Sequence, residues 1–221
     1  MDMTRNHKER LAVNNQNGKV PMTDQHRVVV SIDGSNLYHR LEENCRRADL
    51  DFELFAYKLA GGRPLFRTYY YNIAQDADRK PDQHKEQQKF LASLYAVPRM
   101  ELRLGTQKMR GDQFVEKGVD IMLATDLLRY AWEDMYDVAI LVSGDADFTY
   151  AVSTVKSLGK HLEVAAFPSN LAWELANAAD DRHFLDEEYF KDLWVGNKRT
   201  PTRGRRRKRP ARRGGGRGED V

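Results

Sequence analysis

Two short apolar runs stand out along the chain, RVVVSI at residues 27–32 and DVAILVS at residues 137–143. Continuous runs of this length, rich in β-branched residues, are typical of strands buried on both faces of a parallel sheet. Three further stretches predict strands. They are residues 64–73 (PLFRTYYYNI), 100–108 (MELRLGTQK) and 161–167 (HLEVAAF).

Between these strands lie segments with the spacing of helices, in which apolar residues recur on a polar background. Helix ends are marked by Gly61–Gly62 and by Gly159. The regular alternation of strand and helix predicts an α/β fold: a mostly parallel sheet with helices on both faces. In such folds ligands bind beyond the carboxyl ends of the strands. The predicted helices span residues 36–47, 51–60, 80–96, 119–132, 147–158 and 170–180.

The two ends of the chain differ in composition from the part between them. Residues 1–26 are polar, and residues 196–221 are dominated by Arg, Gly and Pro. Neither segment can bury enough apolar surface to offset chain entropy, so we expect both to be disordered. The sequence therefore predicts a leader at 1–26, one folded domain at 27–195 and a basic tail at 196–221.

The near-neutral net charge of +3 conceals a division between body and tail. Residues 198–221 hold eleven basic and two acidic side chains, a net charge of +9, so the remaining residues carry −6. We expect the tail to bind polyanions and the body to expose an excess of carboxylates.

Composition also excludes several classes of protein. The longest uninterrupted apolar run has five residues, at 138–142, far short of the roughly 20 that span a bilayer. The single cysteine, Cys45, can form neither an internal disulfide nor a thiolate zinc cluster. No segment near the N-terminus resembles a signal peptide. We therefore expect a cytoplasmic protein that does not associate with membranes.

Four aspartates are the strongest chemical signal. Asp33 follows the first apolar run, Asp145 and Asp147 follow the second, and Asp120 lies in the first turn of a predicted apolar helix. Each alone is an ordinary cap or turn residue. If the two strands are parallel neighbours, however, the carboxylates converge at one edge of the sheet and repel one another unless a cation lies between them. Oxygen ligands without His or Cys favour Mg²⁺ or Mn²⁺. Gly34 and Gly144 are interpreted as the residues that permit the sharp turns after the strands.

Three motifs carry a resemblance to a known family: IDGSNLY at 32–38, KGVDIMLATDLL at 117–128 and VSGDADF at 142–148. Together they resemble the NYN domain, of the PIN-like nuclease superfamily, and within it the bacterial LabA-like group. The resemblance implies a PIN-like α/β/α sandwich with a central, mostly parallel sheet, an acidic Mg²⁺ or Mn²⁺ site and RNA as substrate. Carried over by position, Asp33, Asp120 and Asp145 match the metal-binding acids of the family, and Asp147 is its usual fourth member.

Several residues near the acids are candidates for binding substrate. Asn36 would begin a helix whose free N–H groups suit a phosphate. Ser35 and Ser143 could donate hydrogen bonds to carboxylate or phosphate, although for all three a turn or cap role is equally well supported. Arg110 and Lys117 are predicted to lie in a loop beside the acids, where they either hold substrate phosphates or form a solvated loop.

Two further features have structural and functional interpretations. Asp126 falls on the apolar stripe of the helix at 119–132, about 240° around the axis from Asp120, which favours a structural role over metal ligation. The aromatic run at 68–71 (TYYY) could stack on bases, but at least two of its tyrosines are expected in the core or at the sheet edge.

The basic tail resembles arginine–glycine RNA-binding segments, which contact phosphates without reading sequence. We favour RNA tethering over a solubilising or targeting role because the body resembles a nuclease. The tethering candidates are Arg205, Arg206, Arg207, Lys208, Arg209, Arg212 and Arg213.

The sequence thus favours a metal-dependent endoribonuclease with catalytic and metal-binding Asp33, Asp120, Asp145 and Asp147, and a tail that aids RNA binding. The alternative is a PIN-like module that binds RNA and regulates it without cutting. A third is a nuclease or phosphatase acting on DNA or nucleotides, because a metal ion held by carboxylates does not by itself distinguish ribose from deoxyribose. A homo-oligomer and a ribonucleoprotein partner both stay open.

Overall fold

The computed structural model describes residues 25–75, 77, 80–110 and 113–197, with only the backbone path given for 107–110, 113–117 and 197. The predicted disordered leader at 1–26, apart from its last two residues, and the predicted tail, apart from residues 196 and 197, lie outside the described residues.

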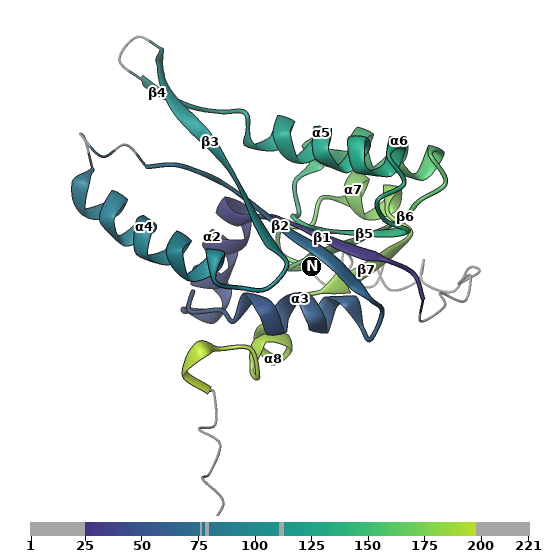
Figure 1. Cartoon of the computed structure of the whole chain (residues 1–221), viewed down its shortest axis with the longest axis horizontal. Helices are drawn as coiled ribbons and strands as arrows, with labels where there is room; N and C mark the ends of the chain where they lie inside the picture. The colour runs from purple at the N-terminus through teal and green to yellow at the C-terminus, as the bar shows by residue number, and fades with distance from the viewer. Residues whose placement is uncertain (1–24, 76, 78–79, 111–112, 198–221) are drawn as a thin grey trace, which may run out of the picture.

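A single twisted sheet runs through the described part of the chain and holds seven strands in the order β4-β3-β2-β1-β5-β6-β7. All neighbours pair in parallel except β3 and β4, which form an antiparallel hairpin. In Figure 1 this hairpin extends away from the rest of the domain. The strands are β1 (Val28–Asp33), β2 (Leu65–Ile73), β3 (Met100–Arg110), β4 (Gln113–Lys117), β5 (Val138–Val142), β6 (His161–Ala166) and β7 (Asp181–Phe184).

The two apolar runs form the centre of the sheet, as their composition predicts. Every residue of β1 and of β5 is buried. Successive side chains of a strand point to opposite faces, so Val28, Val30 and Ile32 belong to one core and Val29 to the other. Helices must therefore cover both faces.

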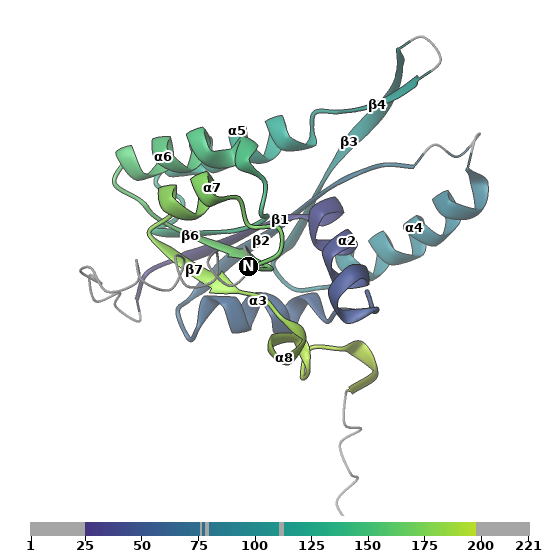
Figure 2. The same cartoon turned by 180° about the vertical axis from the view of Figure 1, so that it is seen from behind.

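The helices form one layer on each face, as Figures 1 and 2 show from opposite sides. The first core packs under α2 (Gly34–Cys45), α3 (Phe52–Ala60), α4 (Pro81–Tyr95) and α8 (Glu187–Phe190). The second packs under α5 (Val119–Trp132), α6 (Thr149–Ser157) and α7 (Trp173–Ala178). Two short 3₁₀ turns, η2 (Ala146–Phe148) and η3 (Val195–Asn197), complete the described elements. The predicted α/β/α sandwich is confirmed.

The prediction of a loop after β3 was wrong. The segment containing Arg110 and Lys117 is a β-hairpin and not a loop. Tyr69, Tyr70 and Tyr71 are all buried, because β2 is an internal strand covered on both faces, which confirms the expectation that at least two of them lie in the core. In the described ranges, no helix is both long and apolar enough to cross a membrane.

The topology creates one position where a ligand crevice is expected. The chain builds β1, β2 and β3 outward in one direction, and then returns through α5 to place β5 on the other side of β1. The connections after β1 and β5 therefore leave the sheet in opposite directions. In open α/β sheets this switch point is where ligands bind.

Away from that edge, an ion pair links Arg63, in the turn before β2, to Glu163 of β6. Arg63 donates to Glu163 at 2.5 and 3.0 Å, and His183 Nε2 lies 2.7 Å from the same carboxylate. Burial alone would raise the pKa of Glu163. Hydrogen bonds from His161 and His183 and the pairing with Arg63 outweigh it and hold the pKa well below its ordinary value. Glu163 is therefore charged in the folded protein and depends on its partners.

Replacing Arg63 with alanine should lower the free energy of unfolding by about 3–5 kcal/mol, because removing one partner leaves a buried charge poorly compensated. Urea unfolding at pH 7, followed by circular dichroism, measures the change. The control is Lys191→Ala, which removes an exposed pair with Glu188 and should shift the midpoint far less. Equal shifts for the two variants would show that the Arg63 pair does not stabilise the fold.

Candidate functional site

Asp33 lies at the carboxyl end of β1 and is almost fully buried, at 6% exposure. One carboxylate oxygen accepts a hydrogen bond from the backbone N–H of Asn36 (3.0 Å) and so caps α2. The other accepts from Ser143 Oγ (3.2 Å), at the end of the neighbouring strand. Both oxygens are thus held in place by the ends of β1 and β5, which the parallel pairing of these strands brings together.

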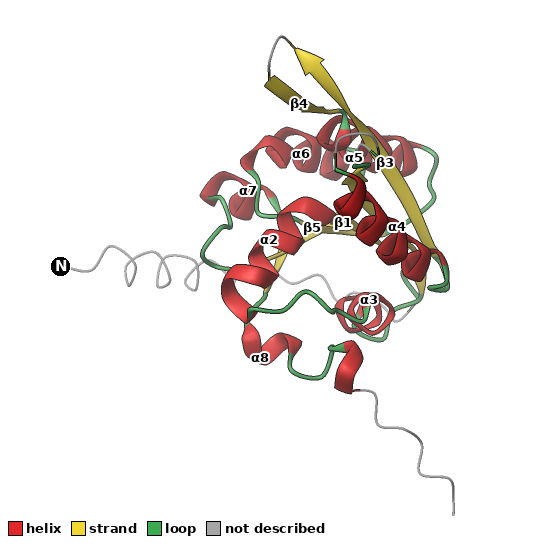
Figure 3. Cartoon of the chain, turned by 90° about the vertical axis from the view of Figure 1, so that its left-hand side faces the viewer, coloured by secondary structure: helices red, strands yellow, loops and turns green. Residues whose placement is uncertain are grey.

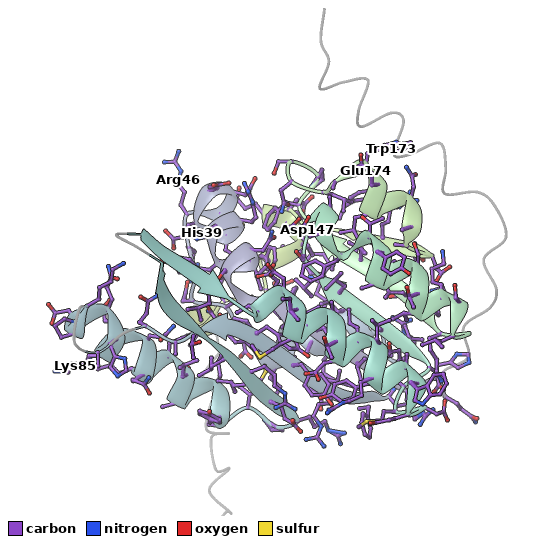
Figure 4. All side chains as sticks on the ribbon, turned by 90° about the horizontal axis from the view of Figure 1, so that it is seen from above. His39, Arg46, Lys85, Asp147, Trp173 and Glu174 are labelled. Atoms are coloured by element: carbon purple, nitrogen blue, oxygen red, sulfur yellow. The ribbon has the colours of Figure 1, made fainter. Side chains whose placement is uncertain are left out.

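Asp145 follows β5 through a short turn that the same serine supports. The backbone N–H of Asp145 donates to Ser143 Oγ (3.3 Å), and its carboxylate caps η2 by accepting from the backbone N–H of Asp147 (3.0 Å). Asp145 and Asp147 are both exposed. Figure 4 shows Asp147 on the same side of the molecule as His39 of α2 and Trp173 of α7.

Asp120 lies at the same edge of the sheet, but at the start of a helix and not at the end of a central strand. The hairpin strand β4 ends at Lys117, and Gly118 adopts φ = 93° before α5 begins at Val119. A side chain would be strained in this left-handed conformation, so glycine permits the abrupt change from strand to helix. Asp120 then lies in the first turn of α5.

These elements enclose a cavity of about 390 Å³ at the switch point, here called the acidic pocket. Asp33, Asp120 and Asp145 all line it, whereas Asp147 does not. Three of the four predicted acids therefore line one cavity, and the fourth lies on η2. The remaining lining residues are Ser35, Asn36, His39, Arg40, Glu43, Ile73, Gly118 and Val119.

The electrostatics of Asp33 reflect this crowding. Burial raises its pKa above the ordinary value, and the charges of Asp120 and Asp145 raise it further. The hydrogen bonds from Asn36 and Ser143 act in the opposite direction without cancelling the effect. A negative charge on Asp33 is thus disfavoured in the protein alone, and a cation in the pocket would favour it.

The donor set fits a hard divalent cation. Carboxylate oxygens, with serine and asparagine oxygens nearby, are the ligands that Mg²⁺ and Mn²⁺ prefer. No three His, Cys, Asp or Glu side chains within the described ranges already form a group that could hold a metal ion. To bind one cation together, the exposed side chains of Asp120 and Asp145 would therefore have to turn toward Asp33. Two hydrogen bonds hold Asp33 in place.

Comparison with known proteins decides the family. The NYN domain model matches residues 27–187, which is most of the chain. The chain belongs to the NYN domain family. Its members are PIN-like, nuclease-type domains, in agreement with the three motifs around the acidic pocket.

Two relatives extend this assignment. The low amplitude and bright protein LabA of Synechococcus elongatus is 26% identical over 156 residues, covering 70% of this chain and 81% of LabA. A crystal structure of a protein of unknown function from Vibrio parahaemolyticus superposes with a TM-score of 0.63 at 23% identity. The match covers 80% of this chain and all of that one, and supports the fold alone.

The substrate-binding candidates of this NYN domain divide into three groups. Ser35 and Asn36 line the acidic pocket, but Asn36 does not begin α2: the helix starts at Gly34, and the N–H of Asn36 is taken by Asp33. Ser143 is buried behind Asp33 and positions it. For Arg110 and Lys117 only the backbone is described, on β3 and β4 of the hairpin.

The sequence prediction missed three charged or titratable residues of the pocket, which are His39, Arg40 and Glu43. They continue the face of α2 that begins at Asn36, because residues three, four and seven positions further on lie on one side of a helix. Arg40 Nη1 pairs with Glu43 Oε2 at 2.5 Å, while the buried Nε of Arg40 has no hydrogen-bond partner among the described residues. That periodicity was visible in the sequence.

Asn170 is a further residue that only the structure reveals. Its Nδ2 donates to Asn36 Oδ1 (3.1 Å), which connects the loop before α7 to the pocket. A Cβ on Gly144 would lie 2.4 Å from the backbone oxygen of Asn170. Neither Gly144 nor Gly34 has positive φ, so the interpretation that they permit sharp turns was wrong. They are required by close packing, and a Cβ on Gly34 would lie 2.7 Å from Tyr71 O.

Asp126 has the structural role that its position on α5 predicts. It accepts a hydrogen bond from the hydroxyl of Tyr71 (3.1 Å) and pairs with Arg103 (3.4 Å) and Arg129 (3.7 Å). It is absent from the described lining of the acidic pocket. Its charge is compensated by these neighbours, so it needs no metal.

Replacing Gly144 with alanine should destabilise the NYN domain by about 1–3 kcal/mol, because the new methyl group forces Asn170 or the Asp145 turn to move. Thermal unfolding measures the effect. The matched control is Gly196→Ala, whose methyl group would have Arg47 Nη2 at 3.8 Å as its nearest neighbour. If both variants melt like the wild type, close packing at Gly144 is not a constraint.

Proposed function

We propose that this NYN domain is a metal-dependent endoribonuclease. The observation that carries the proposal is the acidic pocket, in which Asp33 is buried between the ends of β1 and β5 and shares the cavity with Asp120 and Asp145. Like charges are gathered at the position where α/β sheets bind ligands, and their mutual repulsion has no structural benefit of its own. Membership of a nuclease-type family supports the same conclusion.

Asp33, Asp120 and Asp145 would hold Mg²⁺ or Mn²⁺, with Asp147 beside them as the fourth acid. When bound, such an ion would polarise a phosphoryl oxygen and make water a better nucleophile at neutral pH. Ser143 keeps Asp33 oriented through a hydrogen bond, and the α2 N–H of Asn36 does the same from the other side. The protein thus holds Asp33 in place as one prearranged ligand, toward which Asp120 and Asp145 would turn to bind the cation.

Arg40 is the residue best suited to bind the substrate phosphate. It lines the acidic pocket, Glu43 fixes one end of its guanidinium group, and its Nε is buried without a partner among the described residues. A guanidinium group forms strong charge-assisted hydrogen bonds with phosphate oxygens. Arg40 would therefore retain RNA at the pocket whose carboxylates repel it.

The double variant Asp33→Asn/Asp145→Asn should lose RNA cleavage by more than about 100-fold, since even residues that only support metal ligands typically contribute 10–100-fold. Cleavage of structured and unstructured RNA is measured with Mg²⁺ and with Mn²⁺. Each cation should also raise the melting temperature of the wild type and leave that of the double variant unchanged.

The control is Asp192→Asn, which makes the same chemical change at an exposed site away from the pocket. Unchanged cleavage in the double variant would show that the acidic pocket is not the catalytic site. Metal and RNA binding by the wild type without cleavage would support the alternative, a regulatory RNA-binding module. Cleavage of DNA in preference to RNA, in a panel of both, would reassign the substrate.

We further propose that the basic tail tethers RNA to this site. Truncation of residues 198–221 removes a net charge of +9 and should weaken RNA binding while reducing the dependence of log K on log salt. Titrations from 50 to 200 mM salt, with the full chain as control, measure both quantities. Metal-induced stabilisation should persist in the truncated protein. Equal affinity before and after truncation would overturn the tethering proposal.

A further inference from the structure

A second cavity is lined by residues of α2 and α4, two helices that lie on the same side of the sheet in Figures 2 and 3. It is called here the α2–α4 groove and measures about 540 Å³, within the range of small-molecule binding sites. Its apolar wall contains Leu41 and the rings of Phe52, Tyr70 and Phe90, which pack against one another edge to face. Exposed Tyr38 lies at its rim.

The groove adjoins the acidic pocket. Ser35, His39 and Ile73 line both cavities. A molecule with one end in the acidic pocket could therefore extend into the groove past these three residues without leaving the protein surface.

The two cavities differ sharply in chemistry. The acidic pocket is lined by three aspartates, a glutamate and Arg40. The described lining of the groove contains neither Lys nor Arg, and its only carboxylate is Glu86. Aromatic rings and side-chain amides make up much of the rest. The groove is thus unsuited to a phosphate and suited to a flat, uncharged group that can both stack and form hydrogen bonds.

One amide in the wall has an unused acceptor. The backbone N–H of Gln75 donates to Gln87 Oε1 (2.8 Å), and Gln87 Nε2 donates to the carbonyl of Ile73 (2.7 Å), so α4 holds the end of β2 in place. Gln75 Oε1 is buried and has no hydrogen-bond partner among the described residues. A buried acceptor without a donor is costly, and an N–H group of a ligand would satisfy it.

We propose that the α2–α4 groove binds one unpaired nucleobase of the RNA, next to the phosphate held in the acidic pocket. The inference rests on the proposed function and adds to it a separate subsite, for the base that adjoins the bound phosphate. A nucleotide matches the pair of cavities, with its charged phosphate on the Arg40 side and its flat base on the aromatic side. A base within a duplex has both faces stacked and its pairing edge occupied, so it could not enter.

The test is photocrosslinking of a single-stranded RNA that carries 4-thiouridine. It uses the full chain with Asp33→Asn/Asp145→Asn, whose neutral side chains should neither cleave nor repel the strand. Crosslinks are expected on the peptide containing Tyr38 and His39 or on that containing Phe90. Adding Ala48→Phe, which fills the groove without removing a side chain, should lower their yield about tenfold.

The matched control is Ala92→Phe, at an exposed position of α4 outside the described groove lining, which should leave the yield unchanged. Melting curves establish that each variant folds. Tyr38→Ala, at an exposed rim position, provides a second variant should Ala48→Phe not fold, and it should also lower the yield. Duplex RNA should give no groove crosslinks.

Cleavage by the protein without these substitutions is measured in parallel, so that the two proposals can fail separately. Equal crosslinking in Ala48→Phe and Ala92→Phe, or crosslinks only outside the groove, overturns the groove proposal even where RNA is cleaved. Groove crosslinks that Ala48→Phe abolishes support it even where no RNA is cleaved, in which case the ribonuclease proposal fails alone. Absence of any crosslink overturns it as well.

Discussion

The parallel pairing of β1 with β5 is the constraint on which the domain depends. It aligns Val28 with Val138 and continues to the Ile32–Val142 pair, so both strands end at the same level. Asp33 and the Asp145 turn then leave the sheet side by side, tied together through Ser143. Burial of both strands on both faces fixes this register, because a shift by one residue would turn every core side chain to the opposite face. The position of the acids is thus a consequence of core packing.

The same constraint creates an electrostatic cost at the edge of the sheet. Asp33 is buried, and Asp120 and Asp145 raise its pKa further. The buried carboxylate elsewhere in the domain, Glu163, has the opposite environment: Arg63 and two histidines surround it and lower its pKa. Both carboxylates are enclosed by protein, but Glu163 accepts hydrogen bonds from the guanidinium group of Arg63, whereas Asp33 accepts from a backbone N–H and a serine hydroxyl, both neutral. The contrast supports the interpretation that the fold compensates Glu163 by itself and leaves Asp33 to be compensated by something that binds.

Sequence reasoning predicted the parts of the structure that depend on composition and period. It placed α5 at its observed bounds, identified both central strands, and inferred the convergence of Asp33, Asp120 and Asp145 from the topology alone. It failed for short elements and for contacts between segments far apart in the sequence. Strand β4 has only five residues, too few to show a clear alternation of apolar and polar side chains. The close approach of Gly144 to Asn170 joins segments that no local pattern connects.

Helix α2 links the electrostatic and the apolar sides of the proposed substrate site. Asn36, His39, Arg40 and Glu43 face the acidic pocket, while Leu37, Tyr38 and Leu41 line the α2–α4 groove. The cap at Asp33 sets where this helix starts and therefore how both faces are oriented. Asp33 is a proposed metal ligand and also caps α2, the helix that carries the proposed phosphate and base contacts. It would therefore couple metal binding to the binding of both the phosphate and the base. Occupation of the acidic pocket by a cation would then act on the start of α2 directly, and through α2 on the groove.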